Sequence, residues 1–399
     1  MAAATTLERL PAPRYYALLA AGLLVLLTGL GAFHYMEEHG HIVTGMNNQV
    51  VWGMPHVFAI FMIVAASGVL NVASIGSVFG QAVYKVRAPL SGLLCLALLA
   101  GGLMVLMLDL GRPDRIIVAA THYNFTSVFA WNVFLYSGMF AIVAVYLWTL
   151  MERRMNRWSK PAGLAAFVWR LILTTGTGSI FGFLVARQGY GSAMLAPMFI
   201  IMSFAWGLAL FYLVQAALLA AHGMTLDPAI QRRMKNLLGV FVAATLYFVV
   251  AHHLTNLYFA RQTEFERFIL IDGGVHSVLL WLGFGVVGTA LPLMLLFHPT
   301  LGMSPRATVF AACGVLAGAF ALLYAFIIGG QVWPLELFPG HAVTSSFGDG
   351  RIASYSPSLP EVLLGLGGLA AAFLITVIGV RVLPFVPVDT PPSAAGPAK

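Results

Sequence analysis

Protonatable side chains gather near one end of several apolar stretches of this chain, and their types suit proton-coupled chemistry on a lipid-soluble carrier. His56 begins one stretch, Asp109 ends the next, and His122 and Asn132 follow at the start of a third. The two-electron, two-proton reaction of a quinone needs donors for two ring oxygens and groups that exchange protons with water. A histidine and a carboxylate at one depth, beside an apolar slot, meet both needs. The predicted quinone-binding and proton-exchange residues are His56, Asp109, His122, Tyr123, Trp131 and Asn132.

The elements that must position these groups are ten long apolar stretches. The 399-residue chain is 60% hydrophobic and 9% charged, whereas soluble domains carry about 25% charged residues. Each stretch reaches the roughly 20 residues that cross a bilayer as a helix. We therefore predict an all-α integral membrane protein with about ten transmembrane helices. The expected spans are 16–33, 54–79, 90–109, 128–150, 162–186, 194–221, 237–259, 274–297, 307–329 and 361–383.

The lengths of the connections suggest how these helices associate. Helices two to five and helices six to nine would form two successive four-helix bundles, with the first and tenth helices at the periphery. We expect a single polytopic membrane domain over residues 1–383. The segment 384–399 is rich in Pro and Ala, which predicts a disordered tail.

The charges indicate the orientation of the chain. Fourteen Lys and Arg residues fall on the side of both termini, six fall on the other side, and Arg170 lies within a span. Positively charged loops remain in the cytoplasm, so both termini are expected there, with the chain in a bacterial cytoplasmic membrane. The net charge of +7 is thus a topology signal, and we expect the lipid bilayer, not nucleic acid, as its partner.

The side opposite the termini carries the long loops, at 34–52, 109–127 and 330–360. Long irregular loops in compact proteins are usually functional, so this face is expected to bind partners. Its densest polar segment is acidic and rich in histidine, which suits either a metal site or a docking patch. We favour docking, through Glu37, Glu38, His39 and His41.

Polar residues inside spans form two further groups. A stripe on the second helix and a face of the fifth could carry water and protons from the cytoplasm, or could serve helix packing alone. The residues of this possible proton path are Ser67, Asn71, Arg170, Thr174 and Thr177.

The histidines of the seventh and eighth helices lie near the same outer face. They could be a second proton-exchange cluster, the ligands of a b-type haem, or partners in interhelical hydrogen bonds. This possible second cluster is His252, His253 and His276. The two cysteines, Cys95 and Cys313, lie within spans and belong to no haem-attachment motif. We expect no haem or iron–sulfur cluster to be held by this chain.

Three sequence segments carry a family resemblance. The run Leu-Asp-Leu-Gly-Arg-Pro at 108–113, followed by Ser127 and Trp131, resembles the NrfD/polysulfide-reductase membrane subunits over essentially all ten helices. The segments 34–41 and 52–60 are similar to the DsrP type, the membrane subunit of the Dsr sulfur-metabolism complex.

This resemblance implies a quinone site near the outer face, close to a periplasmic ferredoxin-like iron–sulfur subunit. It also implies further complex subunits such as cytochromes, and a place in dissimilatory sulfur metabolism. Asp109 and His56 carry over as site residues, whereas Asn132 stands where many relatives have Gly.

The resulting hypothesis is a quinone-handling subunit of a multi-subunit oxidoreductase, which is not a complete enzyme alone. A secondary transporter is the main alternative, and a haem-b cytochrome subunit is a third. Transporters usually place coupling charges near the bilayer midplane, whereas no span of this chain has an acidic residue at its centre.

Overall fold

The structure of the protein is a computed structural model. The part of the chain that it describes contains ten helices that are long and apolar enough to cross a membrane, which confirms the predicted fold class. The described residues are 12–335, 338, 341, 350–383 and 385–386, and no strand occurs among them. The predicted tail therefore lies outside the described residues, apart from 385 and 386.

Eight of the spans are single helices: α1 (Ala12–His39), α2 (Met54–Ser77), α4 (Ala88–Leu108), α6 (Val128–Met151), α7 (Ser159–Gly182), α8 (Leu195–Ala221), α9 (Pro228–Tyr258) and α15 (Leu359–Val382). Two spans contain π-helical turns and are written as consecutive segments: α11 (Val275–Val278), η5 (Leu279–Ala290) and α12 (Leu291–Phe297), then α13 (Pro305–Leu323), η7 (Tyr324–Ile328) and α14 (Gly329–Val332).

Short helices occupy the connections. They are η1 (His41–Val43), α3 (Ala82–Lys85), η2 (Pro113–Arg115), α5 (Ile116–Thr121), η3 (Arg153–Trp158), α10 (Thr263–Arg267), η4 (Phe268–Asp272) and η6 (Leu301–Met303).

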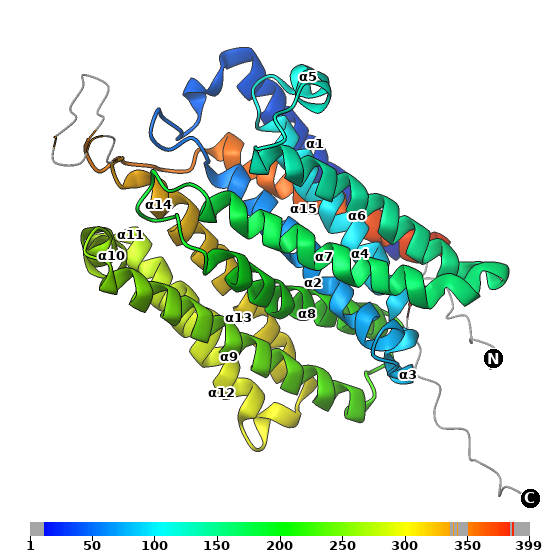
Figure 1. The fold of residues 1–399 in the computed structure, drawn as a ribbon. Coiled ribbons are helices and arrows are strands. Elements are labelled where there is room, and N and C mark those ends of the chain that lie inside the picture. Colours follow the sequence, from blue (N-terminus) through cyan, green and yellow to red (C-terminus); the bar gives the residue numbers. More distant parts are fainter. Residues whose placement is uncertain (1–11, 336–337, 339–340, 342–349, 384, 387–399) are drawn as a thin grey trace, which may run out of the picture.

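Helix α2 is the centre of the assembly and is buried along nearly its whole length. It packs with α4, α6 and α7 in one group, while α8, α9, α12 and α13 form a second group. The two groups meet mainly where α8 contacts α2 and α7. Helix α15 packs against α4 and α2, and α1 packs on α15 at the edge of the assembly (Figure 1).

Two helices are longer than predicted, because each continues from its apolar span into polar sequence. Helix α1 continues to His39, so the segment 34–39 that we assigned to a loop is helical. Helix α9 begins at Pro228, where the Asp227 carboxylate accepts hydrogen bonds from the backbone of Ala229 and Ile230.

The contact between α2 and α8 depends on glycine. A Cβ atom on Gly68 would lie 1.7 Å from the carbonyl oxygen of Ser203, and one on Gly207 would lie 2.1 Å from the carbonyl carbon of Gly68. The two backbones therefore touch directly, as small residues allow in membrane helices. This contact holds the two helix groups together.

Gly68→Ala is expected to destabilise the protein by about 1–3 kcal/mol or more, because its methyl group would overlap the α8 backbone. Gly31→Ala is the matched control, since Gly31 is also helical and a Cβ there would meet nothing within 4 Å. Thermal unfolding of the detergent-purified variants measures both effects. Equal midpoints for the two variants would show that α2 and α8 do not approach this closely.

Candidate functional site

The centre of the site is a histidine–carboxylate pair where α2 begins and α4 ends, on the side of the helix bundle where α1 also ends and α15 begins. We call this side of the bundle the outer side. His56 Nδ1 lies 2.9 Å from Asp109 Oδ2, and the exposed fractions of the two side chains are 15% and 1%. This is an ion-pair distance without a well-aligned N–H···O hydrogen bond, and Asp109 Oδ1 has no partner among the described residues. Such contacts often tighten only when a substrate binds.

Backbone geometry places the carboxylate. Asp109 ends α4, and Gly111 two residues later has a φ of +68°, a left-handed conformation that suits glycine. The imidazole of His41 lies against this turn, with Nε2 3.1 Å from the position of a Cβ on Gly111. His41 therefore belongs to the surroundings of Asp109, and its Nε2 is buried with no partner in the described part of the chain.

Aromatic rings cover the pair on one side. The Trp52 ring stacks on His56 with a centroid distance of 5.8 Å, and it also contacts Phe181 at 5.6 Å and Phe129 at 6.2 Å. These rings come from α6, α7 and the segment before α2. Trp52 thus links the His56 imidazole to rings of α6 and α7, while Asp109 faces it from the end of α4.

Gln331 fixes the backbone that carries Trp52. Its amide oxygen accepts hydrogen bonds from the backbone nitrogens of Val51 and Trp52, at 3.0 and 2.9 Å. Its nitrogen donates to the carbonyls of Trp52 and Ile327. Arg187 adds bonds to the carbonyls of Gln331 and Gln49. A buried amide from the ninth span therefore sets the position of the site's aromatic cover.

Glu361 provides a second anchor from the start of α15. Its fully buried carboxylate accepts hydrogen bonds from the backbone of Gly45 and Ser358 and from the Tyr355 hydroxyl. The same hydroxyl accepts a bond from Met54 N at 2.6 Å. Burial has the largest effect on the pKa of Tyr355 and raises it, and the hydrogen bond to Glu361 raises it further, so this phenol stays protonated.

Arg112, three residues after Asp109, pairs with a different carboxylate. Arg112 makes two hydrogen bonds to the exposed Asp114, both at 3.0 Å. Its guanidinium holds the pKa of Asp114 below the usual value. His56 rather than Arg112 is therefore the polar neighbour of the Asp109 carboxylate.

The other predicted wall residues do not contact this pair. His122 is exposed and bonds to Thr121, while Tyr123 packs on Phe125 and Phe134. Half of Trp131 is exposed. These groups form a separate aromatic patch on the outer surface.

Asn132 lies at the contact between α6 and α7. Its nitrogen donates to the carbonyls of Val128 and Gly176, and its oxygen is buried without a partner among the described residues. The amide thus joins two helices of the first group, and nothing places it against His56.

The predicted path residues of α2 and α7 do meet. Ser67 and Thr174 share a hydrogen bond of 2.5 Å, and both hydroxyls lie within hydrogen-bonding distance of the carbonyl of Arg170. The Arg170 guanidinium is buried between the rings of Phe167 and Phe204. Its Nε and Nη1 have no partner among the described residues.

Two predicted path residues remain apart from this contact. Asn71 lies one turn from Ser67, and its buried nitrogen also has no partner in the described chain. Thr177 bonds back to the carbonyl of Leu173 in its own helix.

Three of the four predicted docking residues lie on the last turn of α1, and His41 begins η1. Glu37, Glu38 and His39 are exposed, and Glu38 pairs with His34 at 3.2 Å. Within the described residues, no group of three or more His, Cys, Asp or Glu side chains is arranged to hold a metal ion.

Comparison with known proteins identifies the type of chain. The family model described as "Polysulphide reductase, NrfD" matches residues 42–334. This chain belongs to the NrfD family.

Similar proteins match most of the chain. The "Hdr-like menaquinol oxidoreductase integral membrane subunit" of Archaeoglobus fulgidus is 30% identical over 94% of each chain. A putative dimethyl sulfoxide reductase membrane subunit of Halobacterium salinarum is 28% identical over 90% of this chain and 89% of its own. "Protein NrfD" of Escherichia coli is 22% identical over 77% of this chain and 99% of its own.

Several residues of this NrfD-family site escaped prediction from sequence. Trp52 lies in the segment 52–60 that resembles the DsrP type, but nothing in the sequence marks its ring as the cover of His56. Gln331 and Tyr355 lie in or next to a long loop that shows no period. Glu361 and Ser358 do match the sequence signature of a helix capping box. That signal predicts where α15 begins, but not that Glu361 binds Gly45.

Tyr355→Phe is expected to lower the free energy of unfolding by about 1–3 kcal/mol, because Met54 N and Glu361 each lose a buried partner. Tyr16→Phe is the matched control, since Tyr16 is 65% exposed. The difference in the free energy of unfolding between the wild type and Tyr355→Phe is fully present below the pKa of an unfolded tyrosine, which is about 10.

This difference declines as the pH rises from there toward the higher pKa of Tyr355 in the folded protein, because the tyrosine of the unfolded chain then loses its proton first. Thermal unfolding at about pH 8 and above pH 10 tests both statements. An equal stability difference between the wild type and Tyr355→Phe at both pH values would contradict the raised pKa of Tyr355.

Proposed function

We propose that this NrfD-family chain is the quinone-handling membrane subunit of a respiratory oxidoreductase. The observation that carries the proposal is the His56–Asp109 pair, with a carboxylate that is 1% exposed and has one oxygen without a partner among the described residues. A buried carboxylate without full hydrogen bonding is costly. Such a carboxylate is retained most readily where a ligand or a proton supplies its missing hydrogen-bond partner.

The geometry suits proton exchange with a quinol hydroxyl. His56 turns Nδ1 toward Asp109, and Nε2 has no hydrogen bond within the described chain. A proton on Nδ1 leaves Nε2 free to accept a proton from the hydroxyl, and the Asp109 carboxylate then stabilises the imidazolium. The reverse transfer serves quinone reduction. Trp52 holds the imidazole plane in place during either step.

The relatives support a quinol as the substrate class. One is named as a membrane subunit of a menaquinol oxidoreductase and another as a membrane subunit of a dimethyl sulfoxide reductase. We propose menaquinol or ubiquinol as the exchangeable ligand. His122, Tyr123, Trp131 and Asn132 remain proposed only as outer wall residues that such a ligand meets on entry.

The proposed electron partner is a periplasmic ferredoxin-like iron–sulfur subunit, in a complex with further subunits such as cytochromes. Exposed Glu37, Glu38 and His39 at the end of α1 supply an acidic docking patch near the site. His41, which contacts the turn at Gly111 just after Asp109, lies between this docking patch and the proposed quinone site. The similarity to the DsrP type supports a role in dissimilatory sulfur metabolism, in a bacterial cytoplasmic membrane with both termini in the cytoplasm.

A water path from the cytoplasm is the second part of the proposal. Ser67, Thr174 and Arg170 form a buried polar seam between α2 and α7, with Asn71 one turn closer to the cytoplasm. The unpartnered nitrogens of Arg170 and Asn71 require water or anionic partners in a bilayer. Water along this seam would connect the cytoplasm with the first helix group, and Thr177 would continue it outward.

Asp109→Asn is expected to reduce quinol oxidation by the intact complex by about 10²–10⁴-fold, because the neutral amide cannot stabilise the His56 imidazolium. Oxidation of a soluble menaquinol analogue, followed by absorbance, measures the rate. Asp114→Asn is the matched control, since this carboxylate is exposed and paired with Arg112. Wild-type turnover in Asp109→Asn would refute the site.

Thr174→Val is expected to slow proton uptake from the cytoplasmic side about tenfold, because the seam loses the hydroxyl that joins Ser67 to α7. Thr175→Val is the matched control, since its hydroxyl is exposed and bonds only to Leu171 of its own helix. A pH dye in vesicles that contain the complex measures the rate. Unchanged proton movement in Thr174→Val and in Arg170→Ala would remove the seam from the mechanism.

A further inference from the structure

The second helix group has a histidine–carboxylate pair of its own, which the quinone site does not use. His253 Nδ1 lies 2.7 Å from Glu266 Oε2, and Glu266 is completely buried. The glutamate belongs to α10, which folds back onto the outer end of α9. This is the same chemical pairing as His56 and Asp109, with better hydrogen-bond geometry.

Asn256 extends the pair to a second histidine. Its side-chain nitrogen lies 2.7 Å from Glu266 Oε1 and 3.3 Å from His252 Nε2. An amide nitrogen has two protons to donate, so His252 Nε2 acts as the acceptor. The remaining proton of the neutral His252 ring then resides on Nδ1. That nitrogen is buried and has no partner among the described residues.

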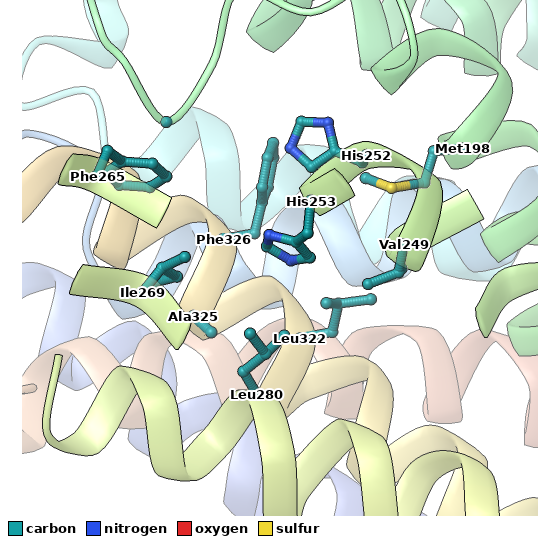
Figure 2. A pocket seen from close by; sticks show the side chains of 11 residues that line it. Met198, Val249, His252, His253, Phe265, Ile269, Leu280, Leu322, Ala325 and Phe326 are labelled. Carbon is teal, nitrogen blue, oxygen red and sulfur yellow. The ribbon is translucent and has the colours of Figure 1, made fainter. Parts of the chain in front are cut away.

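A pocket adjoins this unpartnered donor. Figure 2 shows the imidazoles of His252 and His253 and the ring of Phe326 around one space, which Phe265 and Leu322 help to enclose. The space has room for about one water molecule rather than for a quinone ring. A buried N–H donor beside such a space favours an occupant with a hydrogen-bond acceptor, and a water oxygen fits.

We propose that Glu266, His253 and Asn256, with a water bound at His252, form a proton-binding site in the second helix group. The site takes up one proton from the outer aqueous phase and returns it there. His253 is the exchange group, because its side chain is 17% exposed while that of Glu266 is not exposed. His253 lies five residues from the end of α9, about 7.5 Å along the helix.

The proton balance is simple. Without the extra proton, the pair holds one proton that is shared between the His253 imidazole and the Glu266 carboxylate. With it, His253 is an imidazolium and Glu266 a carboxylic acid, still hydrogen-bonded to Asn256. No electron moves, so the proposal is independent of the quinone site.

The other titratable groups nearby are engaged in their own contacts. His276 stacks on Tyr324 at 5.7 Å, and Arg267 pairs with Asp272 at 3.0 Å on the surface. On the loop at the pocket's rim, Arg187 and Tyr190 bond to backbone carbonyls. Glu264, on the exposed side of α10, faces away. His276 Nδ1 is buried and has no partner in the described chain.

Infrared difference spectroscopy of the resting protein, without quinol, tests the site. Between about pH 5 and pH 9 the wild type is expected to show a carboxylic-acid C=O band that grows as the pH falls. Glu266→Gln should abolish this band and keep the bond to Asn256. Asp272→Asn is the matched control and should retain it, and Asp109→Asn should retain it as well.

A second variant covers the case in which Glu266→Gln does not fold. His253→Gln leaves the carboxyl group present but removes the exchange group, so the pH dependence of the band should be lost. A band that persists in Glu266→Gln, or an unchanged pH dependence in His253→Gln, would overturn the proposal. Neither result depends on quinol turnover, so failure here is distinguishable from failure of the quinone site.

Discussion

The requirement that buried polar groups find partners inside a bilayer governs this structure. Without water, every unpaired donor or acceptor raises the free energy of the folded chain. Gln331 and Glu361 satisfy this requirement fully, with four and three hydrogen bonds. Both tie the outer segment 45–54 to the last two spans. The position of Trp52, and through it of His56, depends on these two buried side chains.

Other buried polar groups are not satisfied in this way. Asp109, Arg170 and His252 each have buried polar atoms without a partner among the described residues. They lie at the outer end of the first helix group, along its interior, and at the outer end of the second group. Atoms of this kind are where a ligand, a proton or water can bind with a gain in free energy. The proposed functions of the chain therefore follow from where its hydrogen bonding is incomplete.

The two helix groups present similar chemistry in different settings. His56 and Asp109 lie beneath Trp52, with an imidazole nitrogen left for a ligand. His253 and Glu266 form a closed arrangement with Asn256, next to space for water only. The first setting suits exchange of protons with a bulky carrier. The second suits storage of a proton, and the direct backbone contact at Gly68 and Gly207 joins the two groups.

The sequence alone determined the ten spans, because the free energy of membrane insertion sums over local residues. It also marked Asp109 and His56, since a charged or polar residue at the end of a span is conspicuous. It did not reveal that they pair, or that Glu266 joins His253, or that Gln331 holds Trp52. Glu361 and Gly45 are 316 residues apart, and no periodicity encodes a partner at such a distance. Only the packing of the helices decided these contacts, because it alone brings distant side chains to one depth and excludes the water that would otherwise satisfy them.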